Sequence, residues 1–152
     1  MRLAAHGISV ELPPGWDGRI FHRAGAAILH AASFPLPAQD GDFGAEATRR
    51  MAAQSTFVTI KEYVPDTQLR PGHGLFAPRS LPLPLAHGQF HPRGLQVARP
   101  GQAGFQHFFT VGERPFCLYA VIRSNHQSGA AAARHPLEVL DRVLRSLAFD
   151  SQ

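Results

Sequence analysis

Two runs of alternating apolar residues near the C-terminal end constrain the fold of this 152-residue chain more than any other feature. In residues 116–122, and in residues 105–111 apart from His107, apolar side chains occupy every second position. Such alternation is typical of β-strands, whose successive side chains point to opposite faces. The intervening residues 112–115, Gly-Glu-Arg-Pro, favour a turn, so the pattern predicts an antiparallel hairpin. Phe108 and Tyr119 fall on the alternate face, so we expect both faces of this hairpin to be covered.

Further strands are predicted in the first half of the chain. Residues 8–12 alternate between apolar and polar and end at Pro13-Pro14-Gly15, where proline removes an amide donor. Residues 19–23 and 26–34 follow as two short strands separated by a glycine turn. Residues 56–64 are rich in β-branched and aromatic side chains and predict a fourth strand.

A first helix is expected after the turn at Asp40-Gly41-Asp42. We assign Asp42 as the residue that caps its free amides. Phe43, Ala47 and Met51 recur every four residues, which indicates one apolar stripe about three turns long.

A second helix is expected at the C-terminal end, after an alanine-rich loop over residues 124–134. Pro136 suits its first helical position, where the missing amide donor costs nothing. Its apolar stripe consists of Leu137, Leu140, Val143, Leu144 and Leu147. Together the patterns predict an α+β fold, a mainly antiparallel β-sheet of about six to seven strands packed by two helices, in one domain over residues 1–152.

Residues 65–100 form a long segment rich in proline and glycine that interrupts this regular pattern. We expect one or two short strands within it, near residues 74–77 and 94–98. Long irregular segments in compact domains are commonly functional, so this one is a candidate partner-binding region.

Four residues are candidates for binding a partner protein. Phe76, Phe90 and Arg93 lie in the irregular segment, where aromatic and arginine side chains would make good contacts if exposed. Trp16 follows the first proline-glycine turn and either locks that turn to the core or serves as an exposed anchor.

Charge and composition restrict the function classes. The formal net charge is +4, but the basic residues are scattered along the chain, and all except Lys61 are arginine. A nucleic-acid-binding protein should gather its basic residues on one face, so nucleic acid is not expected as a partner. The start of the chain lacks the apolar run of a signal peptide, and Cys117 has no second cysteine to pair with. A cytoplasmic protein without a membrane span is therefore expected.

No residue pattern indicates catalysis, a metal or a cofactor. His87 and His91 have helical spacing, but Gly88 and Pro92 argue against a helix there. Three further histidines, which could converge in space, lie on predicted strands: His22, His30 and His107. The candidate nucleophile pair is Cys117 with a histidine such as His107 across the hairpin, and Cys117 is better explained as a buried small residue. We therefore assign no catalytic, metal-binding or cofactor-binding residues.

Two stretches of the chain resemble the PsbP/Mog-type superfamily. They are Gly-Ile-Ser-Val-Glu-Leu-Pro-Pro-Gly-Trp at residues 7–16 and Val-Leu-Arg-Ser-Leu at residues 143–147. The resemblance implies an α/β/α sandwich built on a mainly antiparallel sheet. It also implies a role in binding or assembly rather than catalysis, and it assigns no binding residue in this chain.

The leading hypothesis is a non-catalytic binding or assembly factor that contacts a partner protein. The alternative is a structural subunit of a multi-copy complex or phage-tail-like particle, which would make the chain part of an oligomer or larger assembly. A third hypothesis, a small hydrolase or metal-dependent enzyme, has the least support in the sequence.

Overall fold

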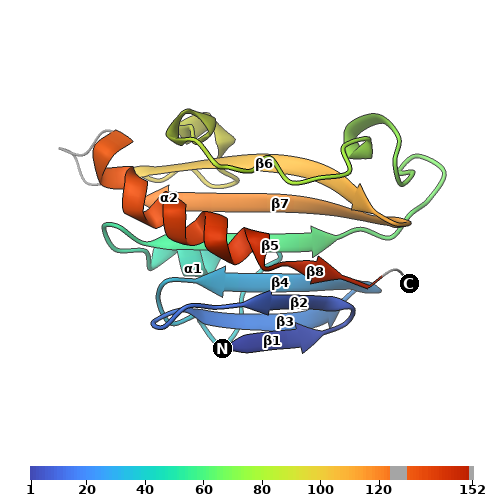
Figure 1. Cartoon of the computed structure of the whole chain (residues 1–152), viewed down its shortest axis with the longest axis horizontal. Helices are drawn as coiled ribbons and strands as arrows, with labels where there is room; N and C mark the ends of the chain where they lie inside the picture. The colour runs from blue at the N-terminus through green and yellow to red at the C-terminus, as the bar shows by residue number, and fades with distance from the viewer. Residues whose placement is uncertain (124–129, 151–152) are drawn as a thin grey trace.

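The computed structural model describes residues 1–123 and 130–150, with side chains in the last helix described from residue 134 onward. Within these residues the fold is α+β and contains eight strands in two antiparallel sheets together with two α-helices (Figure 1). The coarse prediction of a mainly antiparallel α+β fold is confirmed. The prediction of one sheet with six to seven strands is replaced by two sheets.

The larger sheet contains five strands in the order β3-β4-β5-β7-β6. Their bounds are Asp17–Arg23 for β3, Ala26–Ala32 for β4, Thr56–Glu62 for β5, Gln102–Val111 for β6 and Arg114–Arg123 for β7. The smaller sheet has the order β1-β2-β8, with bounds Arg2–Ala5, Ile8–Glu11 and Ala148–Phe149. The predicted hairpin is β6 and β7, joined by a turn at Gly112 and Glu113.

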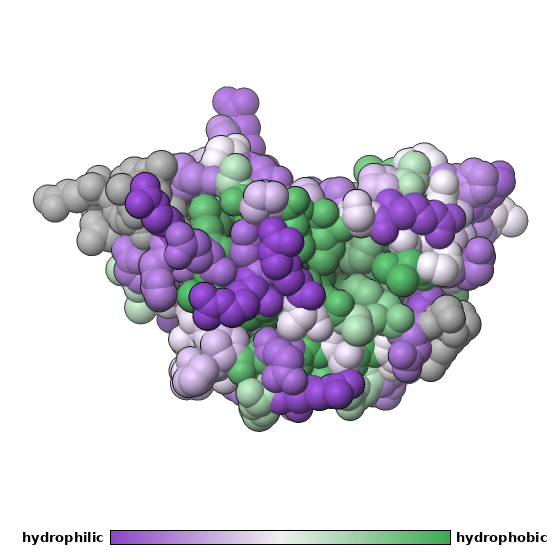
Figure 2. All heavy atoms as spheres, in the orientation of Figure 1, coloured by the Kyte–Doolittle hydropathy of each residue, from purple (hydrophilic) through white to green (hydrophobic). Residues whose placement is uncertain are grey.

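Helices lie on both faces of the five-stranded sheet. Helix α2 (Ala130–Arg145) crosses the front face with the small sheet beside it, and helix α1 (Ala45–Arg49) lies behind the sheet (Figure 1). Front-face residues such as Leu29 and Leu118 join Leu140 of α2 in the main core cluster. On the back face, residues such as Phe57 and Tyr119 form a second cluster with Ala47 of α1. Apolar side chains gather along the middle of the front surface, between hydrophilic ones (Figure 2).

Gly44 allows α1 to sit directly on β5. Its φ of +70° lies in the left-handed region, which favours glycine. A Cβ atom at this position would lie 2.1 Å from Cζ of Phe57, a distance that no side chain tolerates. The close approach fixes the segment before α1 against the back face of the sheet.

The first helix differs from its predicted form. It covers only Ala45–Arg49, although Ala47 and Met51 are buried as the apolar stripe predicted. Asp42 does not cap it, because its carboxylate pairs with Arg23 and Lys61. The carboxylate of Asp40 instead accepts hydrogen bonds from amides in the first turn. Gly44 occupies the N-cap position and has no side chain to cap with, so the capping carboxylate comes from earlier in the chain.

The second helix begins earlier than predicted. It includes the four alanines of residues 130–133, so Pro136 lies inside it rather than at its first position. Alanine has the highest helix propensity, which favours this extension. The predicted stripe is buried from Leu137 to Leu144, and Leu147 lies beyond the helix end. The predicted loop over residues 124–134 is wrong from residue 130 onward, and residues 124–129 lie outside the described residues.

Residues 65–100 contain no strand, so the short strands predicted near residues 74–77 and 94–98 are wrong. Three short 3-10 helices occur instead, at Gly74–Phe76, His87–Gln89 and Pro92–Gly94. The segment pairs with β6 in a single bridge between His91 and Gly104, and further hydrogen bonds join it to His107 and Thr110 of that strand. Its prolines lack the amide donors that a β-ladder needs.

Arg114 joins the two sheets through a buried guanidinium group. Two hydrogen bonds reach the carboxylate of Glu62, with Nε to Oε2 at 2.8 Å and Nη2 to Oε1 at 3.1 Å. Three more reach the carbonyl oxygens of His6, Gly7 and Asp150 at 2.9–3.0 Å. All five N–H donors of the guanidinium are therefore used. The turn between β1 and β2 and the end of β8 are both tied to the large sheet at this point.

Replacing Arg114 by Met should lower the free energy of unfolding by about 3–5 kcal/mol, because Glu62 would be left without its charged partner. Chemical denaturation measures the loss. Arg145→Met on the exposed side of α2 is the matched control and should stay within about 0.5 kcal/mol of wild type. A loss below about 1 kcal/mol for Arg114→Met would contradict this role.

Glu62 should make the protein sensitive to acid. Burial alone would raise the pKa of Glu62, but hydrogen bonds from Arg114 and from the amide of Ala27 outweigh it and hold the pKa below its usual value. A lowered pKa gives stability that is complete above the ordinary glutamate value of about 4.3 and is lost as the pH falls below it. Glu62→Gln should therefore be less stable than wild type at pH 7, and the difference should shrink toward about pH 3. A difference independent of pH, measured by denaturation across this range, would contradict the linkage.

Candidate functional site

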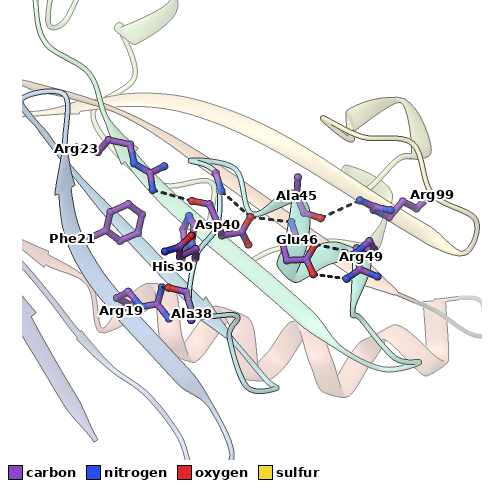
Figure 3. Close-up of a pocket in the computed structure, with 12 residues that line it drawn as sticks. Arg19, Phe21, Arg23, His30, Ala38, Asp40, Ala45, Glu46, Arg49 and Arg99 are labelled. Atoms are coloured by element: carbon purple, nitrogen blue, oxygen red, sulfur yellow. Dashed lines mark hydrogen bonds and ion pairs between the residues drawn. The ribbon is translucent and has the colours of Figure 1, made fainter.

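The back face carries an open concavity of about 820 Å³ at its β3 edge (Figure 3). Arg19, Phe21 and Arg23 of β3 lie on one side, and residues around α1 lie on the other. The full lining consists of Arg19, Phe21, Arg23, His30, Ala38, Gln39, Asp40, Gly41, Ala45, Glu46, Arg49 and Arg99. We call this feature the basic concavity.

Strand alternation places the floor of the basic concavity. Arg19, Phe21 and Arg23 occupy every second position of β3, so they share the back face. His30 pairs with Arg19 across the β3–β4 ladder and therefore lies on the same face. The His30 ring meets the rings of Phe21 and Phe57 edge-on, with centroids 5.1 and 5.3 Å away.

Arginines of β3 hold the opposite wall in place. The guanidinium of Arg19 donates to the carbonyl oxygens of Pro37 and Ala38 at 2.8 and 3.1 Å. Arg23 donates to the carboxylate of Asp42 at 2.6 Å and to the carbonyl oxygen of Asp40 at 2.9 Å. The chain before α1 is thereby fastened to the edge strand of the sheet.

Asp40 orders this wall from within. Its carboxylate accepts hydrogen bonds from the amides of Gly41, Glu46 and Ala47 at 2.8–2.9 Å. Two of these amides belong to the first turn of α1, so Asp40 satisfies donors that a short helix leaves free. Both oxygens of Asp40 are occupied, and its role at the site is structural.

His30 is buried beneath the concavity and stays neutral near pH 7. Burial lowers its pKa and outweighs the opposing effect of its hydrogen bond to the backbone. In that bond Nε2 donates to the carbonyl oxygen of Asp42 at 2.8 Å. The hydroxyl of Thr59 donates to the same oxygen at 3.1 Å. His30 therefore supports the wall and adds no charge to the concavity.

The electrostatic balance of the basic concavity is positive. Four arginines against the carboxylates of Asp40 and Glu46 leave a formal charge of +2. Glu46 is already paired, because hydrogen bonds from Arg49 and Arg50 lower its pKa to about 2. Arg19 and Arg99 come within ion-pair distance of no carboxylate in the part of the chain that the structure describes.

Arg99 is the least satisfied of the four arginines. It reaches the wall from the irregular segment and donates one hydrogen bond, from Nη2 to the carbonyl oxygen of Ala45 at 3.0 Å. Its Nε is buried and has no acceptor among the described residues. A donor left unpaired in this way is costly in a charged group. The arrangement as a whole is suited to holding an anion.

Cys117 and His107 do not form a nucleophile pair. In the β6–β7 register His107 lies opposite Leu118, whereas Cys117 lies opposite Phe108, so their side chains point to opposite faces. Cys117 is fully buried, and this burial raises the pKa of its thiol to about 12. A protonated, buried thiol is a poor nucleophile.

The strand histidines do not converge. His22 lies on the front face of β3 and packs against His6, with ring centroids 5.0 Å apart. His30 is on the back face, and His107 bonds to the carbonyl oxygen of Ser80 beside β6. Within residues 1–123 and 134–150, no three potential ligands among His, Cys, Asp and Glu gather at one point.

The four candidate partner-binding residues differ in their exposure. Phe76 and Phe90 are buried, each only 6% exposed, and stack edge-on against Phe108 and Phe105. Their rings are core contacts and are not offered to a partner. Arg93 is exposed, and its amide donates to Nδ1 of His91.

Trp16 is partly buried and packs against the front core cluster. Together with Pro136 and Val139 of α2 it lines a small hollow of about 170 Å³. The tryptophan therefore connects the first turn to α2 and still exposes part of its ring. None of the four candidate residues lines the basic concavity.

Comparisons with protein-family models, curated proteins and solved structures gave no match to this chain. None of the helices that the structure describes combines the length and apolar character needed to cross a lipid bilayer. The site therefore has to be interpreted from its own geometry.

Asp40→Ala should loosen the wall of the basic concavity. We expect a loss of about 0.5–2 kcal/mol in the free energy of unfolding, as for removal of a helix cap. The amides of Glu46 and Ala47 should also exchange hydrogen faster, because their acceptor is gone. Glu113→Ala in the exposed β6–β7 turn is the control and should change neither quantity. Unchanged amide exchange in Asp40→Ala would contradict the role of this carboxylate.

Proposed function

We propose that this chain is a non-catalytic binding or assembly factor that holds a partner protein at the basic concavity. The observation that carries the proposal is the set of arginines facing an open hollow, two of which, Arg19 and Arg99, have no carboxylate partner among the described residues. Charged, open surfaces of this kind contribute to partner choice and to the rate of encounter. The site is broad and solvent-exposed, as a protein contact requires.

The chemistry of the lining also favours binding over catalysis. Both carboxylate oxygens of Asp40 accept hydrogen bonds from backbone amides, and Glu46 is held in its charged form by two arginines. His30, the titratable ring at the floor, already donates its Nε2 proton to the wall. A general base needs a free site within reach of a substrate proton, and these groups are committed elsewhere.

The fold class supports the same proposal by analogy. Helices on the two faces of a mainly antiparallel sheet are compatible with the PsbP/Mog-type sandwich that residues 7–16 and 143–147 resemble. That superfamily is associated with binding and assembly. Because fold likeness alone does not establish function, the main support for the proposal is the set of arginines in the concavity.

The proposal is tested by affinity capture from a lysate of the source cells. Three forms of the tagged chain are compared: wild type, the triple variant Arg19→Gln/Arg49→Gln/Arg99→Gln, and a control with Arg2→Gln/Arg142→Gln/Arg145→Gln. The control removes the same charge from exposed positions outside the concavity. We expect proteins that wild type and control retain equally and that the triple variant loses. Shortening residues 68–92 is a poorer test, because it removes buried Phe76 and Phe90 from the core.

Partners that remain bound to the triple variant would contradict the proposed site. Thermal melting of all three forms shows whether a loss of capture reflects unfolding. Melting temperatures within a few degrees of one another are expected, because Arg49 and Arg99 are anchored only to the short wall of the concavity. When Arg19 is replaced, Arg23 still fastens that wall to β3.

A further inference from the structure

We infer that the partner segment held by the basic concavity is an extended peptide rich in aspartate and glutamate. This inference rests on the function proposed above and names the chemistry of the ligand. Three features of the site lead to it: arginine N–H donors without a protein acceptor, the spacing of these arginines along the wall, and an open lining with a single large apolar side chain.

The arginines keep donors for a ligand. A guanidinium has five N–H donors. Within the described residues Arg19 uses two of them, Arg23 uses two and Arg99 uses one. Carboxylates match the guanidinium geometry with paired hydrogen bonds, which are among the stronger ones in proteins. The contrast with Arg114, which uses all five donors inside the protein, separates a structural arginine from these.

The arginines are spread along the wall rather than aimed at one point. Arg19 is bonded to Pro37 and Ala38 at one end of the loop before α1. Arg99 is bonded to Ala45 at the other end of that loop. A single phosphate group is usually held by donors that converge on it. Separated arginines instead suit several carboxylates carried at intervals along one chain.

The lining favours an extended chain over a small molecule. Small-molecule pockets are mostly apolar and enclose most of the ligand. Here Phe21 is the only large apolar side chain in the lining, and the side chains of Arg23 and Arg49 are 45% and 58% exposed. A peptide can lie across such a surface with its acidic side chains on the arginines and its other face in water.

The test uses fluorescein-labelled deca-glutamate and the change in its fluorescence anisotropy on binding. Wild type should bind this probe, and the affinity should fall as the salt concentration rises from about 20 to about 200 mM.

The double variant Arg19→Gln/Arg99→Gln should weaken binding by about tenfold or more, because the charged contacts at both ends of the wall are lost. The double variant Arg49→Gln/Arg99→Gln keeps Arg19, which fastens the wall to β3, and should also weaken binding. A loss in this variant therefore cannot be attributed to detachment of the wall at Arg19. Labelled deca-glutamine should not bind.

Arg142→Gln/Arg145→Gln is the control for the overall positive charge of the protein. Both residues are exposed on α2, on the opposite face of the sheet from the concavity. This control should bind deca-glutamate within about twofold of wild type. An equal loss in the control and the concavity variants would overturn the inference, because binding would then reflect net charge alone.

Competition separates the peptide from smaller anions. Inorganic phosphate should not displace the probe when the ionic strength is held constant by lowering the concentration of the other salt. Displacement by phosphate would overturn the inference in favour of a small-anion site. If deca-glutamate fails to bind while capture still depends on the concavity arginines, the inference fails and the proposed function stands. If captured partners ignore those arginines, the proposed function fails, and with it the assignment of the segment to a partner protein.

Discussion

The buried pair between Arg114 and Glu62 is the interaction on which the arrangement of the two sheets depends. It joins β7 to β5 within the large sheet, and its remaining donors reach three backbone carbonyls of the small sheet and its flanks. The side chain of Arg114 is only 5% exposed, so each of these donors would be costly to leave unpaired. One residue thus connects the start, the middle and the end of the described chain.

The arginines of the basic concavity differ from Arg114 in how many of their N–H donors are bonded within the protein. Arg114 is saturated by the protein, which makes it a structural residue. Arg19 is bonded to the wall through two donors and keeps the rest, and Arg99 is bonded through one. The same residue type therefore fastens the fold where it is fully paired and, in the function proposed above, supplies charge to a partner where it is not.

Sequence patterning predicted those parts of the fold in which one local period dominates. The alternation in residues 105–122 gave the β6–β7 hairpin, and the leucine stripe after Pro136 gave the buried face of α2. The two-residue strand β8 has too few residues to show any period. The Arg114–Glu62 pair joins positions 52 residues apart, so no local window could contain it.

The candidate site could not be predicted from the sequence for a related reason. Its floor is visible in the sequence as Arg19, Phe21 and Arg23 on one strand face, but its other wall comes from α1 and Arg99, which only the fold brings near. Phe76 and Phe90 of the irregular segment were candidates for contacting a partner if exposed, and both are buried. A segment with few backbone hydrogen bonds to the sheet depends on its side chains for attachment, so its large apolar residues are used for packing. The exposed charged groups lie instead on β3, where the strand fixes the spacing of Arg19 and Arg23.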